Sequence, residues 1–308
     1  MKFNIITHIT TSCNYNCSYC DVIKNKKQMS SKNIEDILEF IKNNKYYIKR
    51  FKFFGGEPLL AWDNVKYIID NSLKYIWNNY EIVTNTSLLN DEIGEYFEKY
   101  FKIIFFSIDT ENKFDYNKIE KFIKKYNLEE KVYFNLVISP NKEKESLGQF
   151  YKLYNIWFRW YNLLPVYFTK PWTKIQLYKL ADFLKYIIDL SLKDNTLRMY
   201  WFMKDETSSS KLAYNSLFID IDTKVYFSDL VSTYSWSEFK DKLFIWNLSN
   251  LSLSDLESEN IESKVKILND MEQSLSNLSL WQNQLHKIMD YFSKYLIKNN
   301  GKQRKPII

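Results

Sequence analysis

The chain has 308 residues, of which 43 are basic and 37 acidic, giving a formal net charge of +6. With 45% hydrophobic and 26% charged residues, it has the composition of a folded protein with a large core, which excludes disorder as its general state. No stretch approaches 18 uncharged apolar residues and no signal peptide is recognisable, so we expect a cytoplasmic protein without a membrane span. The charge excess is small and dispersed, which makes nucleic acid an unlikely partner.

Short apolar runs alternate with segments of helical spacing over the first two thirds of the chain, which indicates parallel strands joined by helices. The helical segments include 34–43, 62–77 and 175–192, and Asn33 is the expected N-cap of the first. Such strands form an open sheet or a barrel, and both bind ligands at the carboxyl ends of the strands. The candidate strands are 2–8, 50–54, 80–84, 102–108, 131–138 and 163–168.

All three cysteines, Cys13, Cys17 and Cys20, lie in one octapeptide after the first predicted strand. This odd, clustered set is no disulfide framework and favours a metal or cluster site. Zinc would need a fourth ligand such as His8 or an aspartate, but His8 lies inside the predicted strand, where a packed histidine is the ordinary outcome. A closed iron–sulfur cluster usually takes four cysteines, so three leave one iron position open for chemistry.

Glycine is scarce, with five in the chain, yet Gly55 and Gly56 stand together in FFGGEPLL at the end of the second predicted strand. A Gly-Gly step permits positive φ and lets a ligand approach bare backbone. Glu57 supplies a carboxylate for an ammonium group, and Pro58 fixes the turn that follows. An ordinary turn between strand and helix is the alternative, which the scarcity of glycine disfavours.

The spacing C-x3-C-x2-C, with the aromatic Tyr19 before the last cysteine, resembles the signature of the radical S-adenosylmethionine (radical SAM) superfamily. In that family three cysteines hold a [4Fe-4S] cluster, SAM chelates the fourth iron, and GGEP holds the methionyl amino group. The resemblance implies a (β/α)6 partial TIM barrel and an external electron donor such as flavodoxin or ferredoxin. It also implies reductive cleavage of SAM to a 5′-deoxyadenosyl radical that abstracts hydrogen from a C–H bond. No catalytic general base is identifiable.

Polar side chains at the ends of the third, fourth and fifth strands suit a ribose and a methionyl carboxylate, although each also suits a turn or a cap. Thr86 replaces a glycine common in relatives, which we expect to alter the local turn. On the resemblance, the residues expected to contact SAM are Tyr19, Gly55, Gly56, Glu57, Pro58, Thr84, Asn85, Ser107, Asp109, Asn135 and Ile138.

The last third resembles the SPASM or twitch extension of peptide-modifying radical SAM enzymes, with a hairpin-like pair over 216–230 and a helix over about 270–298. Ser228 stands where that extension has a cysteine, and Trp246 replaces its turn glycine, so we expect no auxiliary cluster. A small α+β cap of other ancestry is the alternative. The expected domains are a partial barrel (1–204), a cysteine-free cap (205–260), and a C-terminal helical segment with a basic tail (261–308).

The leading functional hypothesis is modification of a peptide or protein side chain, as in the maturation of ribosomally made peptides. Because every thiol belongs to one cluster, chemistry that needs a donor cysteine or an auxiliary cluster is disfavoured. One alternative is a radical SAM enzyme acting on a nucleotide, tRNA or small metabolite. Another is a catalytically inactive descendant that binds peptides. Since the chain begins directly at the first predicted strand, a separate peptide-recognition protein is a further candidate partner.

Overall fold

The computed structural model describes residues 2–166, 172–200, 216–226, 240–253 and 287–292, together with 294, 295 and 298. Its strands belong to one 10-stranded sheet. In chain order they are β1 (Phe3–Thr10), β2 (Ile48–Gly55), β3 (Tyr80–Thr84), β4 (Phe101–Ile108), β5 (Val132–Ile138), β6 (Trp160–Pro165), β7 (Arg198–Met199), β8 (Ser216–Ile219), β9 (Lys224–Tyr226) and β10 (Phe244–Asn247).

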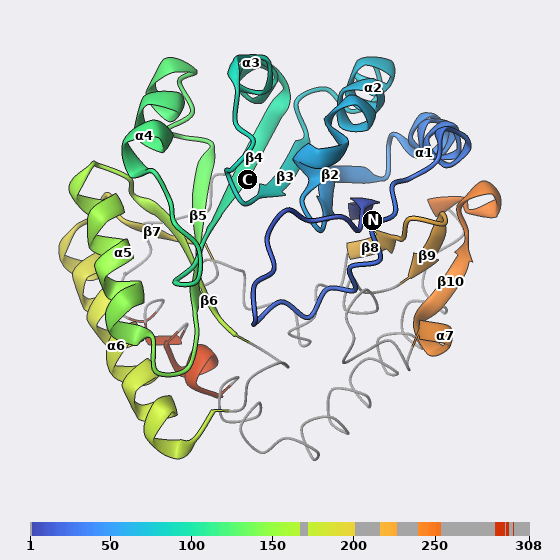
Figure 1. Ribbon diagram of the computed structural model, residues 1–308. Helices are drawn as coiled ribbons and strands as arrows, with labels where there is room; N and C mark the ends of the chain where they lie inside the picture. Colours follow the sequence, from blue (N-terminus) through green and yellow to red (C-terminus); the bar gives the residue numbers. More distant parts are fainter. Residues whose placement is uncertain are drawn as a thin grey trace.

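The longer helices lie along the outer side of this curved sheet (Figure 1). None of the helices in the described ranges has the length and apolar character needed to cross a bilayer. The helices are α1 (Ser31–Asn44), α2 (Trp62–Ser72), α3 (Asp91–Tyr100), α4 (Tyr116–Lys125), α5 (Glu143–Asn155), α6 (Lys174–Lys193) and α7 (Lys240–Leu243), with short 3₁₀ segments η1 (Pro58–Ala61) and η5 (Leu248–Asn250).

The sheet runs in the order β10-β9-β8-β1-β2-β3-β4-β5-β6-β7. Strands β1 to β7 pair in parallel in chain order, and β8 pairs in parallel with the other edge of β1. Among the strands that the structure describes, β9 and β10 run antiparallel to their neighbours. The predicted α/β fold with a large parallel sheet is confirmed, and the carboxyl ends of the parallel strands meet at one rim.

The start of α1 differs from the prediction. Ser30, not Asn33, is the N-cap, because the Ser30 hydroxyl accepts the Asn33 backbone N–H at 3.2 Å, the usual capping geometry. The Asn33 side chain instead donates to the carbonyl of Ile221 at 2.9 Å. The predicted cap was therefore wrong, and Asn33 ties α1 to the turn between β8 and β9.

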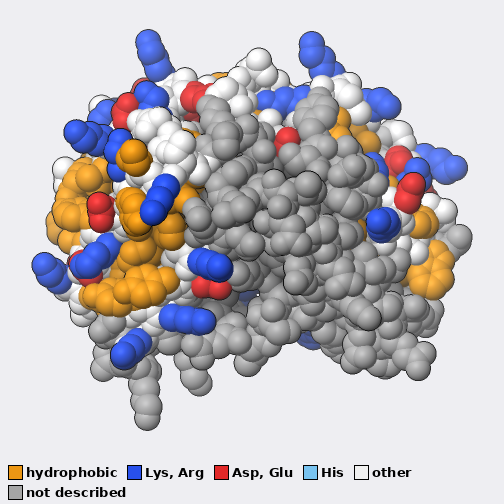
Figure 2. Space-filling view, turned by 90° about the horizontal axis from the view of Figure 1, so that it is seen from below, with side chains coloured by type: hydrophobic (Ala, Val, Ile, Leu, Met, Phe, Trp, Pro, Cys, Tyr) orange, Lys and Arg blue, Asp and Glu red, His pale blue; other side chains and the backbone are white. Residues whose placement is uncertain are grey.

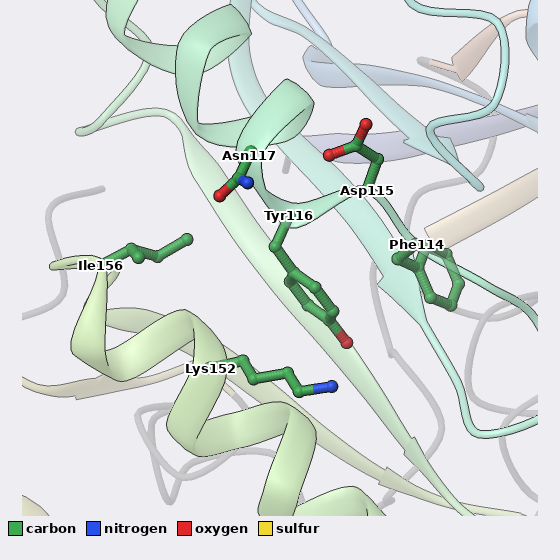
Figure 3. Close-up of a pocket in the computed structure, with 6 residues that line it drawn as sticks. All are labelled: Phe114, Asp115, Tyr116, Asn117, Lys152 and Ile156. Carbon is green, nitrogen blue, oxygen red and sulfur yellow. The ribbon is translucent and has the colours of Figure 1, made fainter.

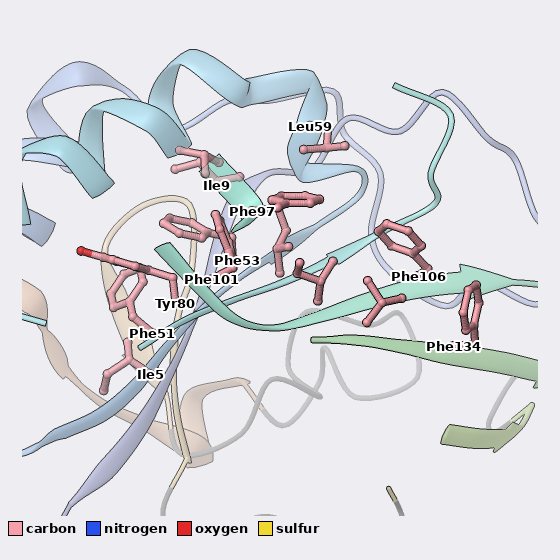
Figure 4. Close-up of a cluster of buried hydrophobic side chains, with 14 of the residues drawn as sticks. Ile5, Ile9, Phe51, Phe53, Leu59, Tyr80, Phe97, Phe101, Phe106 and Phe134 are labelled. Carbon is pink, nitrogen blue, oxygen red and sulfur yellow. The ribbon is translucent and has the colours of Figure 1, made fainter. Parts of the chain in front are cut away.

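The two faces of the parallel sheet bury different side chains. On the outer face, Phe53 and its neighbours pack against helix residues such as Phe97 in one large apolar cluster (Figure 4). Side chains that alternate with these along the strands face the interior. There a separate cluster is formed by Ile103, Phe105 and Tyr133, against which Val83, Trp160 and Tyr200 pack.

Charged side chains lie in this interior near the amino ends of the strands, which we call the amino end of the interior. Arg50 Nη1 lies 2.8 Å from Glu81 Oε1, and Lys52 Nζ lies 3.8 Å from Glu81 Oε2. The Lys52 ammonium also sits 4.5 Å from the centre of the Phe105 ring, a cation–π distance. The amino end is thus filled by side chains, as in other packed barrels, which leaves the carboxyl rim for a ligand.

The predicted hairpin in the last third is present as the antiparallel pair β8 and β9, and it continues the barrel sheet. Trp246 lies on β10 and is 40% exposed. Ser228, the expected boundary near 205 and most of the expected helix 270–298 lie outside the described residues. The division into three domains therefore stays a prediction.

Exposed apolar side chains occur on α6, which begins at the carboxyl rim because it follows β6. Ile175, Tyr178 and Tyr186 are all largely exposed there. Seen from below, hydrophobic side chains gather on the left of the molecule, the side on which α5 and α6 lie in Figure 1 (Figure 2). Part of the outer surface is therefore apolar.

Candidate functional site

The loop that carries the cysteines leaves the carboxyl end of β1 and returns beside it before α1 begins. Thr11 N donates to Lys27 O at 2.9 Å, and Met29 N donates to Ile9 O at 3.0 Å. In Figure 1 this dark blue loop passes from β1 toward the middle of the barrel. We call residues 11–27 the cysteine loop. Its two ends are hydrogen-bonded to each other, so the loop leaves the rim and returns to it at the same place.

The three cysteines are half-buried and form no disulfide. Burial raises the pKa of the Cys13 and Cys17 thiols. A hydrogen bond from the Tyr15 backbone opposes that rise at Cys13, and hydrogen bonds with the side chains of Tyr19 and then Asn112 oppose it at Cys17. Within the described ranges, no group of three or more His, Cys, Asp or Glu side chains is arranged as a metal site. The donor set nevertheless fits an iron–sulfur cluster, because three unpaired thiols share one short loop. Loading a cluster would release their protons.

His8, the zinc ligand weighed above, is packed in the interior as predicted. The centre of its ring lies 4.7 Å from the centre of the Phe218 ring, which it meets edge-on, and 5.4 Å from the centre of the Phe54 ring. Burial lowers its pKa to about 4, so the imidazole is neutral at pH 7. Its Nε2 is buried without a hydrogen-bond partner in the part of the chain that the structure describes.

The glycine pair holds the start of the cysteine loop. Gly55 has φ +145°, as the predicted positive φ requires, and an added Cβ there would lie 2.1 Å from Thr10 O. At Gly56 it would lie 2.1 Å from Ser12 O. Gly56 N donates to Thr10 O at 2.9 Å, and Glu57 N donates to Ser12 O at 2.8 Å. The backbone that approaches these glycines is thus that of the chain itself, and the approach of a ligand stays a prediction.

Glu57 is 1% exposed and joins the ends of β2 and β3. Its Oε1 accepts from the Thr84 hydroxyl at 2.8 Å and from Leu59 N at 3.0 Å, and its Oε2 accepts from Asn85 N at 2.7 Å. Burial raises its pKa to about 7 against these hydrogen bonds. Pro58 follows as the first residue of η1. Glu57 therefore fixes where Asn85 stands, and its contact with an ammonium group stays a prediction.

The turn after β3 reaches the cysteine loop. Asn85 Nδ2 donates to Asn14 Oδ1 at 2.8 Å, and Asn14 Nδ2 donates to the Ser87 hydroxyl at 2.8 Å. Thr86 has φ +68°, the left-handed region that glycine adopts without strain and that costs other residues roughly 1–2 kcal/mol. Threonine thus takes a backbone conformation that glycine would take more easily.

Asp109, at the end of β4, binds the other side of the cysteine loop. Its Oδ2 accepts from the Tyr19 hydroxyl at 2.8 Å, and its Oδ1 accepts from the backbone N–H groups of Glu111 and Asn112 at 2.7 and 2.8 Å. Burial, then the negative charge of Asp109, raises the pKa of Tyr19. The structure therefore brings Tyr19 and Asp109 together, as partners of each other.

Ser107, Asn135 and Asn162 stand side by side on β4, β5 and β6 at one level of the interior. Asn162 Nδ2 donates to Asn135 Oδ1 at 3.0 Å, while Asn162 Oδ1 is buried without a partner among the described residues. Asn162 was not predicted, because it lies just before the predicted sixth strand (163–168) and only the observed β6 includes it. The side chain of Ile138 packs instead in the helix-facing core, so it does not join this row.

A separate hollow of about 520 Å³ lies between the start of α4 and α5 (Figure 3). It contains none of the predicted site residues. Lys152 Nζ stands 5.4 Å from the centre of the Tyr116 ring at this place. The lining residues are Phe114, Asp115, Tyr116, Asn117, Lys152 and Ile156.

Comparison with known sequences finds a family match for the part of the chain that carries the cysteine loop. Residues 7–133 match the model of the Radical SAM superfamily. The radical SAM cyclopropyl synthase TigE of Paramaledivibacter caminithermalis is 32% identical over 126 residues, 34% of this chain and 26% of TigE. The GTP 3′,8-cyclase of Clostridium botulinum is 28% identical over 176 residues, 51% of this chain and 55% of the cyclase. The chain thus matches about a quarter to a half of the length of these relatives.

Solved structures share the fold at low sequence identity. The structure of anSMEcpe with bound AdoMet (SAM) and Cp18Cys peptide superposes with a TM-score of 0.67 at 17% identity, over 86% of this chain and 82% of that one. SuiB of Streptococcus suis bound to the precursor peptide SuiA gives 0.61 at 13% identity, over 84% and 65%. The family implies a [4Fe-4S] cluster and SAM as cofactors. With its cysteine loop over the rim of a parallel barrel, this chain contains a radical SAM domain.

Proposed function

We propose that this chain is a radical SAM enzyme that modifies a side chain of a peptide or protein. The observation that carries the proposal is the cysteine loop, held over the carboxyl rim by Gly56 and Glu57 on one side and by Asp109 on the other. The fold around it is shared, over most of the chain, with two proteins whose structures contain bound peptides. These two supports are independent, because one is local geometry and the other is global topology.

In this proposal, the thiolates of Cys13, Cys17 and Cys20 hold the [4Fe-4S] cluster. When bound, the cluster and SAM supply the reductive cleavage and the primary radical that removes a hydrogen atom from carbon. The protein supplies binding, orientation and the exclusion of water. Asn85 on one side of the loop and the row of Ser107 and Asn135 on the other are the proposed contacts of the nucleoside and methionyl parts of SAM.

The interior beneath the loop suits an uncharged part of a substrate. Phe54 and Phe218 present aromatic rings beside the neutral imidazole of His8. Asn135 and Asn162 present amide groups on the opposite strands. A peptide side chain that carries an unactivated C–H bond, with a neighbouring backbone N–H to donate to Asn162 Oδ1, matches these surroundings.

A nucleotide substrate is the second candidate, because the match to the GTP 3′,8-cyclase covers more of the chain than the match to TigE. A peptide-binding protein without catalysis is the third. Both are tested together with the first, since each predicts a different product pattern.

The test uses anaerobically reconstituted protein with SAM, a reductant, and either peptides encoded beside the gene or GTP. We expect 5′-deoxyadenosine together with a mass change in one peptide, both detected by mass spectrometry. Omission of SAM and replacement of Cys17 by alanine are the controls. A mass change in GTP alone would support the second candidate. A cluster-loaded protein that never cleaves SAM would support the third.

A further inference from the structure

The segment that follows β4 is hydrogen-bonded to three consecutive residues of the cysteine loop. Asp109 accepts from the Tyr19 hydroxyl. Glu111 accepts from Ser18 N at 2.6 Å and from the Ser18 hydroxyl. Asn112 Nδ2 donates to Cys17 Sγ at 3.2 Å. The loop is therefore clamped next to one of the three sulfurs.

The side chain of Asn112 is itself held in place. Its Nδ2 lies 3.0 and 2.8 Å from the two carboxylate oxygens of Asp109, and its backbone N–H also donates to that carboxylate. Asp109 is 3% exposed, and its carbonyl accepts from Gln149 Nε2 of α5. The amide donor is thus aimed at the sulfur by a buried group at the end of β4 that is also hydrogen-bonded to α5.

The charges next to this sulfur indicate how such a donor would affect the reduction of a bound cluster. Asp109 Oδ2 lies 3.9 Å from Cys17 Sγ, and a carboxylate at that distance disfavours adding an electron to a cluster. An N–H dipole directed at the sulfur does the opposite, because it stabilises the more negative, reduced state. Asn112 supplies that dipole, beside the Tyr19 side chain, which is also hydrogen-bonded to Cys17.

We propose that Asn112 is a positioning residue of the cluster, whose Nδ2–H donates to the Cys17 thiolate and raises the reduction potential. This inference rests on the proposed function only in that the three thiolates hold a [4Fe-4S] cluster. It goes beyond that function by assigning a role to a residue outside the C-x3-C-x2-C sequence. It also gives Asp109 the task of directing Asn112.

The test is a potentiometric titration of the reconstituted, SAM-free protein, followed by the EPR signal of the reduced cluster. Asn112→Leu keeps the size of the side chain and removes the donor. We expect about a tenfold fall in the ratio of reduced to oxidised cluster at a fixed potential, equivalent to about 59 mV for one electron. Asn117→Leu, the same substitution at an exposed position of α4, is the matched control and should leave the potential unchanged.

The outcomes separate this inference from the function on which it rests. A wild-type protein without a [4Fe-4S] signal would refute the proposed function itself. If the wild type shows the signal and Asn112→Leu titrates at the wild-type potential, the inference is overturned. Should the leucine variant fail to take up iron, Asn112→Ala is titrated instead, and an unchanged potential there overturns the inference equally. A folded chain that holds iron in neither variant would show a role in assembly and would also contradict the tuning.

Discussion

The two ends of the barrel interior differ in the side chains that fill them. At the amino end, Arg50 and Lys52 pair with Glu81, and aromatic side chains fill the rest of the space. At the carboxyl end, His8 Nε2 and Asn162 Oδ1 are buried without partners in the described part of the chain. Buried polar groups normally have partners. Asn4 Oδ1, on β1 beside Arg50, is also buried without one in the described part of the chain, so it is the ion pairs and aromatic side chains of the amino end that indicate that this end is built for packing and the other for a ligand.

We expect the largest effect on activity from a substitution in the cysteine loop, at the carboxyl end. Replacing Cys17 by alanine leaves two thiolates, which are too few to hold the cluster, so we expect complete loss of SAM cleavage. Iron content and 5′-deoxyadenosine formation measure this in parallel. Cleavage of SAM at the wild-type rate by the variant would remove the cysteines from the mechanism.

The glycine pair offers a test of the packing under the loop. Gly56→Ala would place a Cβ 2.1 Å from Ser12 O, a backbone clash that we expect to cost about 3 kcal/mol in the free energy of unfolding. Denaturation of the cluster-free protein measures it. Gly148→Ala in α5 is the matched control, since nothing lies within 4 Å of its added Cβ. That variant should be neutral or more stable by about 1 kcal/mol.

Arg50→Met tests the amino end. Because it leaves the Glu81 carboxylate with only the longer contact to Lys52, we expect the free energy of unfolding to fall by about 2 kcal/mol. SAM cleavage by the folded variant should be unchanged, since the ion pair lies at the packed end. A variant with wild-type stability but impaired cleavage would reverse the roles assigned to the two ends.

His8 predicts a smaller effect that depends on pH. Its pKa is lowered by burial from 6.5 to about 4, so between these values the unfolded chain binds a proton that the folded chain does not. Stability is therefore lost as pH falls, by about 1 kcal/mol between pH 7 and 5.5. His8→Leu should abolish this part of the pH dependence. Equal slopes in wild type and variant, measured by denaturation at each pH, would show that His8 does not remain neutral in the fold.

Much of this architecture could be predicted from the sequence, because apolar runs in a parallel sheet are buried on both faces. All six predicted strands overlap β1 to β6, although β6 begins at Trp160, three residues before the predicted start. The N-cap of α1 was misplaced because Ser30 and Asn33 are both good capping residues. Local sequence does not decide between them when Asn33 has a tertiary partner in Ile221.

The sequence indicated polar residues at the carboxyl ends of the strands, but not the partners that these residues have in the fold. The family resemblance indicated Tyr19, and the end of the fourth predicted strand indicated Asp109, and only the fold shows that they bind each other. Asn112 and Asn162 carried no signal, since an asparagine after a strand or within one is common. Their importance lies in distances to residues far away in the sequence, which no local pattern encodes.

The central claim is that three thiolates on the cysteine loop hold a cluster whose fourth iron is open to SAM. The most direct test is EPR spectroscopy of the anaerobically reconstituted and reduced protein, with and without SAM. We expect a [4Fe-4S] signal that changes when SAM is added and disappears in Cys17→Ala. A protein that binds zinc or no iron, or a cluster signal that SAM leaves unaltered, would contradict it.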